Sequence, residues 1–189
     1  MLLPDAMEGT RMTGKGIDLK SYIRNIPDWP KKGILFRDIT PLLADPQAFA
    51  AAVKALCAGF SKGDLDYIAA VEARGFIFGA AVAEKLGAGF VPIRKKGKLP
   101  ARTENITYDL EYGTDTLEVH RDAVKSGAKV LMVDDLLATG GTMAAACRLI
   151  EKIGGHVAAV AFLVELKGLG GREKIAGYKM ISIISYEID

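Results

Sequence analysis

Five short apolar segments constrain the fold of this chain more than any other feature. They cover residues 66–71, 89–93, 129–133, 157–164 and 180–185. None alternates strictly between apolar and polar residues, which indicates strands that are buried on both faces, as in a parallel sheet. Because helical segments alternate with these strands, we expect a doubly wound α/β fold with a mostly parallel five-stranded sheet flanked by helices.

Helix start and stop signals frame these strands. Helices are expected over residues 76–86, where Gly87 follows, and over residues 142–153. Asp45-Pro46 opens another helix that runs to about residue 60, since a proline in the first turn costs no hydrogen bond. Apolar residues at helical spacing predict one more helix over Asp18–Ile26, with its first residue as N-cap.

Length and composition exclude several classes of protein. The 189 residues predict a single domain over residues 1–189, with residues 1–17 as a flexible lead. The net charge of +2 argues against a dedicated nucleic-acid binder. No apolar run approaches the ~18 residues of a membrane span, and no signal peptide is evident. Cys57 and Cys147 lie in apolar segments, so we expect free cysteines in a reducing, cytoplasmic compartment. From the charge and the short apolar runs, we expect a protein that binds neither nucleic acid nor membranes.

Residues 94–116 interrupt the alternation of strand and helix. The segment has no helical period and is longer than ordinary connections, which is typical of lids and binding loops. Five of the nine residues from Arg94 to Arg102 are basic. The segment is either a solvated charged loop or a flexible lid that binds anions, and we favour the lid.

Polar segments follow three of the expected strands directly. They are Glu72–Gly75, the basic start of the loop at residue 94, and Asp134–Thr142. Open α/β sheets bind ligands outside the carboxyl ends of their strands. If these strands are parallel, the three segments therefore lie together at one edge of the sheet.

The third of these segments carries the strongest signal of function. It contains Asp134 and Asp135 and then Ala138, Thr139, Gly140, Gly141 and Thr142. Glycines before a helix N-terminus let backbone N–H groups converge on a phosphate, and the threonine hydroxyls add donors. The two aspartates suit a ribose diol. The segment lacks the spacing of a Walker loop or a dinucleotide fingerprint, and the alternative is a tight turn with an Asp cap.

Arg74 follows another expected strand and allows two interpretations. Its planar guanidinium can donate to a pyrophosphate in a fork. It can also form a structural ion pair with Glu72. We favour the contact with ligand.

The motif Val130–Thr142 resembles the 5-phosphoribosyl-1-pyrophosphate signature of type I phosphoribosyltransferases. The similarity is closest to the adenine phosphoribosyltransferase family, and it extends from about Leu19 to Tyr186. Further blocks that resemble the family are Gly33–Leu43, Glu72–Phe76, Arg94–Pro100 and Leu110–Gly113. Several long motifs in the right order make this resemblance specific.

The resemblance implies a reaction of purine salvage. Adenine and 5-phosphoribosyl 1-pyrophosphate give AMP and pyrophosphate, catalysed by a pentosyl-transferring glycosyltransferase. Mg²⁺ is carried mainly by the pyrophosphate substrate, so no dedicated protein metal site is assigned. The resemblance also implies a homodimer, a small N-terminal hood over residues 18–45 that binds the base, and a lid over residues 94–116.

The resemblance further implies roles for single residues. In the hood, the Phe36 ring stacks on the base, while the backbones of Leu35 and Arg37 contact its edge. Two of the remaining residues, Glu111 and Arg74, are implied to be catalytic. The others are implied to bind substrate, either at the phosphoribosyl pyrophosphate site or from the lid: Glu72, Arg94, Lys95, Lys98 and Tyr112. Glu111 is expected to assist proton movement at a ring nitrogen, although a solvated carboxylate is equally compatible with the sequence.

Two other functions compete with this interpretation. The first is the same reaction on another base, such as xanthine or hypoxanthine. The second is a non-catalytic regulator that keeps the phosphoribosyl pyrophosphate site and binds nucleic acid. Only 17 residues precede the first expected helix, which disfavours an added DNA-binding module.

Overall fold

The computed structural model describes residues 16–109 and 113–187. The chain divides into two compact units, one ending at Phe49 and the other beginning at Ala50. The region predicted to be the hood, residues 18–45, lies within the first unit. The segments predicted to bind phosphoribosyl pyrophosphate lie within the second.

The N-terminal unit is built around a small hairpin. It contains the 3₁₀-helix η1 (Leu19–Tyr22), strands β1 (Arg24–Ile26) and β2 (Phe36–Asp38), helix α1 (Thr40–Ala44) and the start of α2 (Pro46–Leu56). The prediction of a helix over Asp18–Ile26 is wrong beyond its first turn. Asp18 does cap that turn by accepting from the backbone N of Lys20. The chain then becomes β1, because antiparallel pairing with β2 overrides the local helical spacing.

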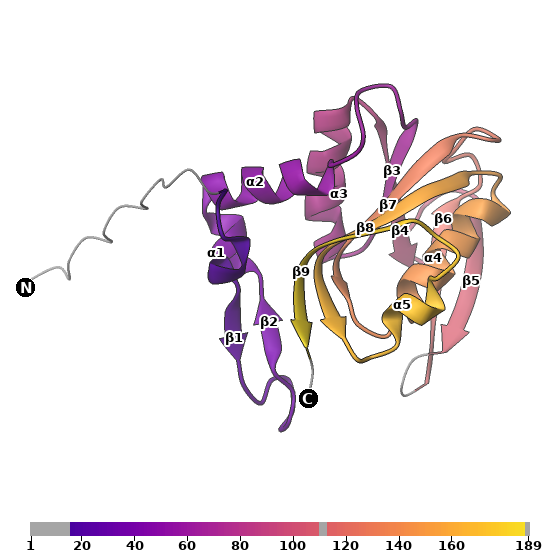
Figure 1. Ribbon diagram of the computed structural model, residues 1–189. Coiled ribbons are helices and arrows are strands. Elements are labelled where there is room, and N and C mark those ends of the chain that lie inside the picture. The colour runs from indigo at the N-terminus through magenta and orange to yellow at the C-terminus, as the bar shows by residue number, and fades with distance from the viewer. Residues whose placement is uncertain (1–15, 110–112, 188–189) are drawn as a thin grey trace, which may run out of the picture. The chain divides into compact units, whose positions relative to one another are not determined.

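The second unit contains one seven-stranded sheet in the order β5-β6-β4-β3-β7-β8-β9. The strands are β3 (Tyr67–Val71), β4 (Gly89–Lys95), β5 (Thr103–Asp109), β6 (Thr114–His120), β7 (Lys129–Leu137), β8 (His156–Lys167) and β9 (Met180–Glu187). The helices are α3 (Arg74–Leu86), α4 (Gly141–Lys152) and the short α5 (Gly171–Lys174). In Figure 1, β5 and β9 lie at the two ends of this sheet.

The five expected parallel strands are confirmed as β4, β3, β7, β8 and β9. The segment expected to be an irregular loop differs from the prediction. Much of it forms β5 and the start of β6, which pair antiparallel, and β6 pairs antiparallel with β4. No signal in the sequence marks β5, the strand at the edge of the sheet, because it is mostly polar and most of its side chains are partly or fully exposed.

The two long helices of this unit cover opposite faces of the sheet. Ala69 and Val71 of β3 share one core cluster with Leu149 of α4. On the other face, Gly79 of α3 lies so close to β3 that a Cβ atom on it would be 2.7 Å from Ala70 Cβ. Alternate residues of β3 therefore contact different helices, as a strand buried on both faces requires.

The strand order reverses between β3 and β7. From β3 the chain passes through α3 to β4 on one side, and from β7 it passes through α4 to β8 on the other. Right-handed crossovers in opposite directions place the two helices on opposite faces. Ligands of open α/β sheets bind at such a point, outside the carboxyl ends of the strands.

The structure also describes the two cysteines and the length of the helices. Cys57 and Cys147 are both free and buried, and burial raises the pKa of the Cys147 thiol to about 12. Such thiols are unreactive core residues. Among the residues that the structure describes, no helix is long and apolar enough to cross a lipid bilayer.

Candidate active site

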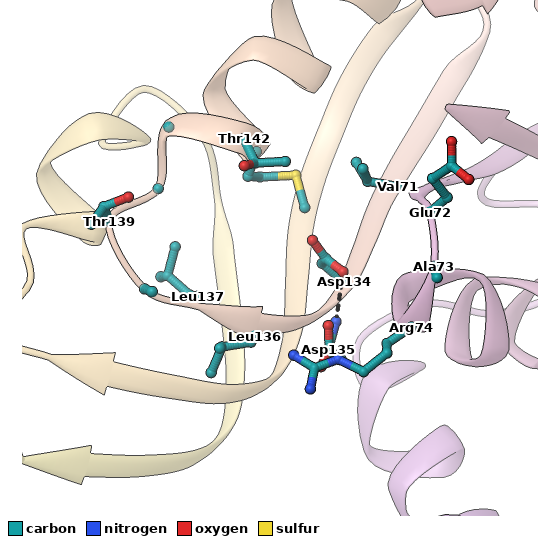
Figure 2. A pocket seen from close by; sticks show the side chains of 14 residues that line it. Val71, Glu72, Ala73, Arg74, Asp134, Asp135, Leu136, Leu137, Thr139 and Thr142 are labelled. Carbon is teal, nitrogen blue, oxygen red and sulfur yellow. Dashed lines mark hydrogen bonds and ion pairs between the residues drawn. The ribbon is translucent and has the colours of Figure 1, made fainter. Parts of the chain in front are cut away.

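A cavity of about 400 Å³ opens at the point where the strand order reverses (Figure 2). Two stretches of the chain line it, residues 71–74 from the end of β3 and residues 134–143 from β7 into α4. Nine of the residues predicted from the sequence lie in this lining: Glu72, Arg74, Asp134, Asp135, Ala138, Thr139, Gly140, Gly141 and Thr142. The structure therefore brings together segments that are about sixty residues apart in the sequence.

The two aspartates point to opposite sides of β7, because successive side chains of a strand alternate. Figure 2 shows the Asp135 carboxylate turned toward Arg74 and the Asp134 carboxylate on the other side of the strand. Arg74 Nε lies 2.8 Å from Asp135 Oδ2. Arg74 therefore forms an ion pair with β7, a partner that the sequence did not indicate.

Burial dominates the electrostatics of the aspartate pair. It raises the pKa of Asp134 well above the ordinary value, and the negative charge of Asp135 raises it further. Burial also raises the pKa of Asp135, although the Arg74 guanidinium opposes this shift. The cavity therefore disfavours two negative charges on the aspartate pair, unless a ligand brings a cation or donates hydrogen bonds to the carboxylates.

Glycine permits the close approach of α3 to the aspartates. A Cβ atom on Gly75 would lie 2.6 Å from Asp134 Oδ1. Asp134 Oδ1 also accepts a hydrogen bond from the backbone N of Asp135, at 2.9 Å. The segment that leads into α3 contains a cis peptide bond between Glu72 and Ala73. The first turn of α3 and the Asp134 carboxylate thus form adjacent walls of the cavity.

The predicted turn from strand to helix is confirmed in residues 137–142. Strand β7 runs through both aspartates to Leu137, and α4 begins at Gly141. Gly140 is the residue before the helix and has φ +75°, in the left-handed region that favours glycine. We call residues 138–142 the phosphate cradle, because their backbone leads into the N-terminus of a twelve-residue helix.

A second loop, residues 168–172 including the start of α5, packs against the phosphate cradle, and sequence reasoning missed it. A Cβ atom on Gly140 would lie 2.6 Å from the Gly171 carbonyl oxygen, and one on Gly171 would lie 2.2 Å from the Ala138 carbonyl oxygen. The backbones of the two loops are therefore in direct contact. The ion pair of Arg172 with the buried Glu165 carboxylate anchors this second loop to β8.

Glu72 anchors the start of the basic segment. Its carboxylate accepts from Arg94 Nη2 at 3.1 Å and from the backbone N of Lys95 at 2.6 Å. Burial alone would raise the pKa of Glu72, but these hydrogen bonds outweigh it and lower the pKa. Arg94 also donates to the carbonyl oxygen of Lys98, and Lys95 Nζ lies 3.2 Å from Asp115 Oδ2. This basic turn is thus fixed beside the carboxyl end of β3.

The remaining predicted residues lie elsewhere in the chain. Leu35, Phe36 and Arg37 belong to the N-terminal unit. There the Phe36 ring packs edge-on against Trp29, with ring centroids 4.3 Å apart. Arg37 donates to the side chain of Asn25. The backbones of Leu35 and Arg37 also belong to this unit, and their predicted contacts with a base are not tested by the structure.

Two predicted residues of the lid, Glu111 and Tyr112, lie outside the described residues. A nearby residue that the sequence did not single out is Tyr108 of β5, whose hydroxyl oxygen lies 3.2 Å from Thr142 Oγ1. A tyrosine in a mostly polar segment gives no signal of this contact, because it depends on the pairing of β5 in the tertiary structure.

Known proteins match both the sequence and this geometry. A family model described as "Phosphoribosyl transferase domain" matches residues 42–189. The adenine phosphoribosyltransferase of Thermotoga neapolitana is 57% identical over 170 residues, which cover 90% of this chain and 100% of that protein. That of Christiangramia forsetii is 55% identical over 170 residues, which cover 90% of this chain and 99% of that protein.

The chain belongs to the adenine phosphoribosyltransferase family. A crystal structure of the adenine phosphoribosyltransferase from Thermoanaerobacter pseudethanolicus superposes with a TM-score of 0.85 at 53% identity, and covers 89% of this chain and 98% of its own. The enzyme of Saccharomyces cerevisiae, crystallised with an imino-altritol bisphosphate and adenine, gives a TM-score of 0.83 at 39% identity, with 88% and 96% covered. Membership of the adenine phosphoribosyltransferase family confirms the predicted fold class and the predicted type of enzyme.

Proposed function

We propose that this chain transfers the 5-phosphoribosyl group of 5-phosphoribosyl 1-pyrophosphate to adenine and releases AMP and pyrophosphate. One observation carries the proposal. A single cavity at the reversal of strand order combines the phosphate cradle, two carboxylates and an arginine. This is the set of groups that a phosphorylated ribose with a pyrophosphate leaving group needs.

The phosphate cradle binds the 5-phosphate of the sugar. Backbone N–H groups at the start of α4 and the hydroxyls of Thr139 and Thr142 supply the donors. The partial positive charge at the helix N-terminus favours the phosphate dianion. Gly140 keeps the backbone open, since a side chain there would collide with Gly171.

The aspartates bind the ribose and Arg74 serves the leaving group. Asp134 and Asp135 accept hydrogen bonds from the 2- and 3-hydroxyls. As the anomeric C–O bond breaks, positive charge develops on the ribose and negative charge on the pyrophosphate, so carboxylates near one and a guanidinium near the other stabilise the transition state. The ion pair with Asp135 holds the Arg74 guanidinium at the edge of the cavity.

Magnesium fits this site as an ion that binds together with the substrate. Burial, together with the neighbouring Asp135 charge, raises the pKa of Asp134, so a pyrophosphate that arrived without a cation would add negative charge to a site that already disfavours it. The oxygens of the pyrophosphate and the ribose, together with water, would hold Mg²⁺, since this ion is rarely enclosed by protein ligands alone. When bound, the ion neutralises charge on the leaving pyrophosphate.

The base contacts rest on the family resemblance and on the hydrogen-bond pattern of the backbone. Phe36 stacks on the base, and the backbones of Leu35 and Arg37 offer one C=O acceptor and one N–H donor. Adenine presents a 6-amino donor beside an N1 acceptor, which this pair satisfies. A 6-oxopurine presents the reverse pattern, and sites that recognise polar groups in this way can reject it by roughly 10⁴-fold. From the lid, Glu111 assists proton movement at the ring, with Tyr112 beside it.

Three further properties belong to the proposal. The basic residues Arg94, Lys95 and Lys98 add positive charge near the pyrophosphate. The chain acts as a homodimer, for which the support is the family resemblance. It acts in the cytoplasm, which its two free, buried cysteines support.

Turnover assays with a set of bases test the proposed function. The protein is incubated with phosphoribosyl pyrophosphate and Mg²⁺ and with adenine, hypoxanthine, guanine or xanthine in turn, and the nucleotide formed is quantified. We expect AMP from adenine, with a kcat/KM far above that for any 6-oxopurine. A comparable kcat/KM for hypoxanthine would assign the chain to the rival reaction, and no nucleotide from any base would exclude catalysis.

A further inference from the structure

Strand β5 contacts the phosphate cradle directly. Tyr108, the penultimate residue of β5, is only 8% exposed, and its hydroxyl oxygen lies 3.2 Å from Thr142 Oγ1. A Cβ atom on Gly141 would lie 3.5 Å from the Asp109 carbonyl oxygen and 3.9 Å from Tyr108 Cδ2. The end of the strand thus lies within reach of one added carbon atom on the cradle, and one pair of hydroxyls connects the two directly.

The hydrogen bond between these hydroxyls can run in either direction, and the direction matters for phosphate binding. A threonine hydroxyl has one hydrogen to donate and two lone pairs to accept with. If Thr142 donates to Tyr108, no hydrogen remains for a phosphate oxygen. If Tyr108 donates, the Thr142 hydrogen is free to point into the cradle.

The surroundings of Tyr108 favour its role as donor. Burial raises the pKa of the Tyr108 hydroxyl, and the negative charge of Asp115 raises it further, although the contact with Thr142 opposes these effects. Because the Tyr108 hydroxyl is buried, its hydrogen needs an acceptor, and Thr142 Oγ1 is the hydrogen-bond partner that lies within reach among the described residues. Thr142 also lines the open cavity, where its own hydrogen can meet an oxygen of the ligand.

We propose that Tyr108 is a positioning residue for the phosphate cradle: its O–H donates to Thr142 Oγ1 and so directs the Thr142 hydrogen toward the 5-phosphate of the substrate. The proposal rests on the proposed function, which places the phosphate in the cradle. Strands β5 and β6 would then contribute to substrate binding independently of any closure of the lid.

The test is Tyr108→Phe, which keeps the buried ring and removes the hydroxyl. One net hydrogen bond corresponds to about a 3- to 10-fold change in binding. We expect the KM for phosphoribosyl pyrophosphate and the inhibition constant of AMP to rise by about this factor. The KM for adenine and the inhibition constant of adenosine, which lacks the phosphate, should stay unchanged.

Tyr178→Phe is the matched control. Tyr178 lines a neighbouring pocket of about 520 Å³ together with Tyr108, but its hydroxyl donates to Glu151 Oε1 at 3.0 Å, away from the cradle. Its removal should leave the ratio of the AMP and adenosine inhibition constants unchanged. An equal effect of both substitutions would overturn the proposal, because it would show a general loosening of the packing.

Thr142→Val separates the proposal from the proposed function. It should weaken the binding of AMP but not that of adenosine. Adding Tyr108→Phe should cause no further loss of AMP binding, because the two hydroxyls act as a unit. If Thr142→Val weakens AMP binding and Tyr108→Phe does not, the positioning role is wrong, but the assignment of the cradle to the 5-phosphate is supported. If Thr142→Val leaves AMP binding unchanged, the Thr142 hydroxyl does not contact the 5-phosphate and the positioning role is wrong, whereas the formation of AMP from adenine tests the proposed function separately.

Discussion

Gly171→Ala tests how strongly the loop behind the phosphate cradle determines substrate binding. A Cβ atom on Gly171 would lie 2.2 Å from the Ala138 carbonyl oxygen and 3.0 Å from Leu137 Cδ1. Real Cβ atoms are essentially never closer than 3.0 Å to another heavy atom, so the two backbones must separate by at least 0.8 Å, the difference between 3.0 and 2.2 Å. The obstructing atom belongs to the backbone of the cradle, and no rotation of a side chain can relieve the collision.

The expected magnitude follows from this displacement. Overpacking of this kind destabilises a fold by about 1–3 kcal/mol. Alanine recovers about 0.5–1 kcal/mol at a helical position, because glycine loses more backbone entropy on folding. The loss in stability should thus be small. The effect on catalysis should be larger, since misplacement of a substrate-binding group by about 1 Å can cost on the order of 100-fold in rate.

Steady-state kinetics and thermal unfolding check this prediction together. We expect kcat/KM for phosphoribosyl pyrophosphate to fall by about 10- to 100-fold, while the KM for adenine changes little. Gly177→Ala is the control, since no atom lies within 4 Å of the added Cβ. A Gly171→Ala protein with wild-type kinetics would refute the reasoning, and so would one in which the affinity for adenine falls equally.

Three further variants probe the charged groups. Asp134→Asn combined with Asp135→Asn should leave the fold intact and lower kcat/KM, at about 1.5–3 kcal/mol for each lost charge-assisted hydrogen bond; a folded double variant with the wild-type value contradicts the ribose assignment. Arg74→Lys should reduce turnover because lysine lacks the planar fork, whereas a lower melting temperature with unchanged specific activity would restrict the arginine to its ion pair with Asp135. Hydrogen bonds from Arg172 lower the pKa of Glu165, so this pair stabilises the fold above the ordinary value of 4.5 and loses that contribution as the pH falls through the lowered pKa. Between about pH 7 and pH 3, the melting temperature of Glu165→Gln should therefore fall less than that of the wild type. Parallel plots of melting temperature against pH would count against this role of the ion pair.

The sequence by itself determined the central architecture, because the relevant signals are local. Apolar segments without alternation identified the five parallel strands, and Asp18 and Gly87 mark helix boundaries that the structure confirms. The turn from β7 into α4 could also be predicted, since its glycines and threonines are contiguous. The grouping of Arg74 with Asp134 followed from a general rule of open α/β sheets rather than from any local pattern.

The partners of these residues were decided only by the tertiary structure. Arg74 forms an ion pair with Asp135, about sixty residues away in the sequence, because the order of strands brings β7 beside β3. The helix expected over Asp18–Ile26 gave way to β1, since a strand partner competes with local periodicity. The mostly polar β5 has no distinct pattern, so its place at the sheet edge depends on pairing with β6.

Close backbone contacts are the least predictable feature of the site. Gly171 and Ala138 are far apart in the sequence, and nothing in either segment indicates that they touch. The contact of Tyr108 with Thr142 likewise requires β5 to lie against the start of α4. Local sequence specifies which groups can bind a phosphate, but the packing of distant segments decides which atoms support and orient those groups.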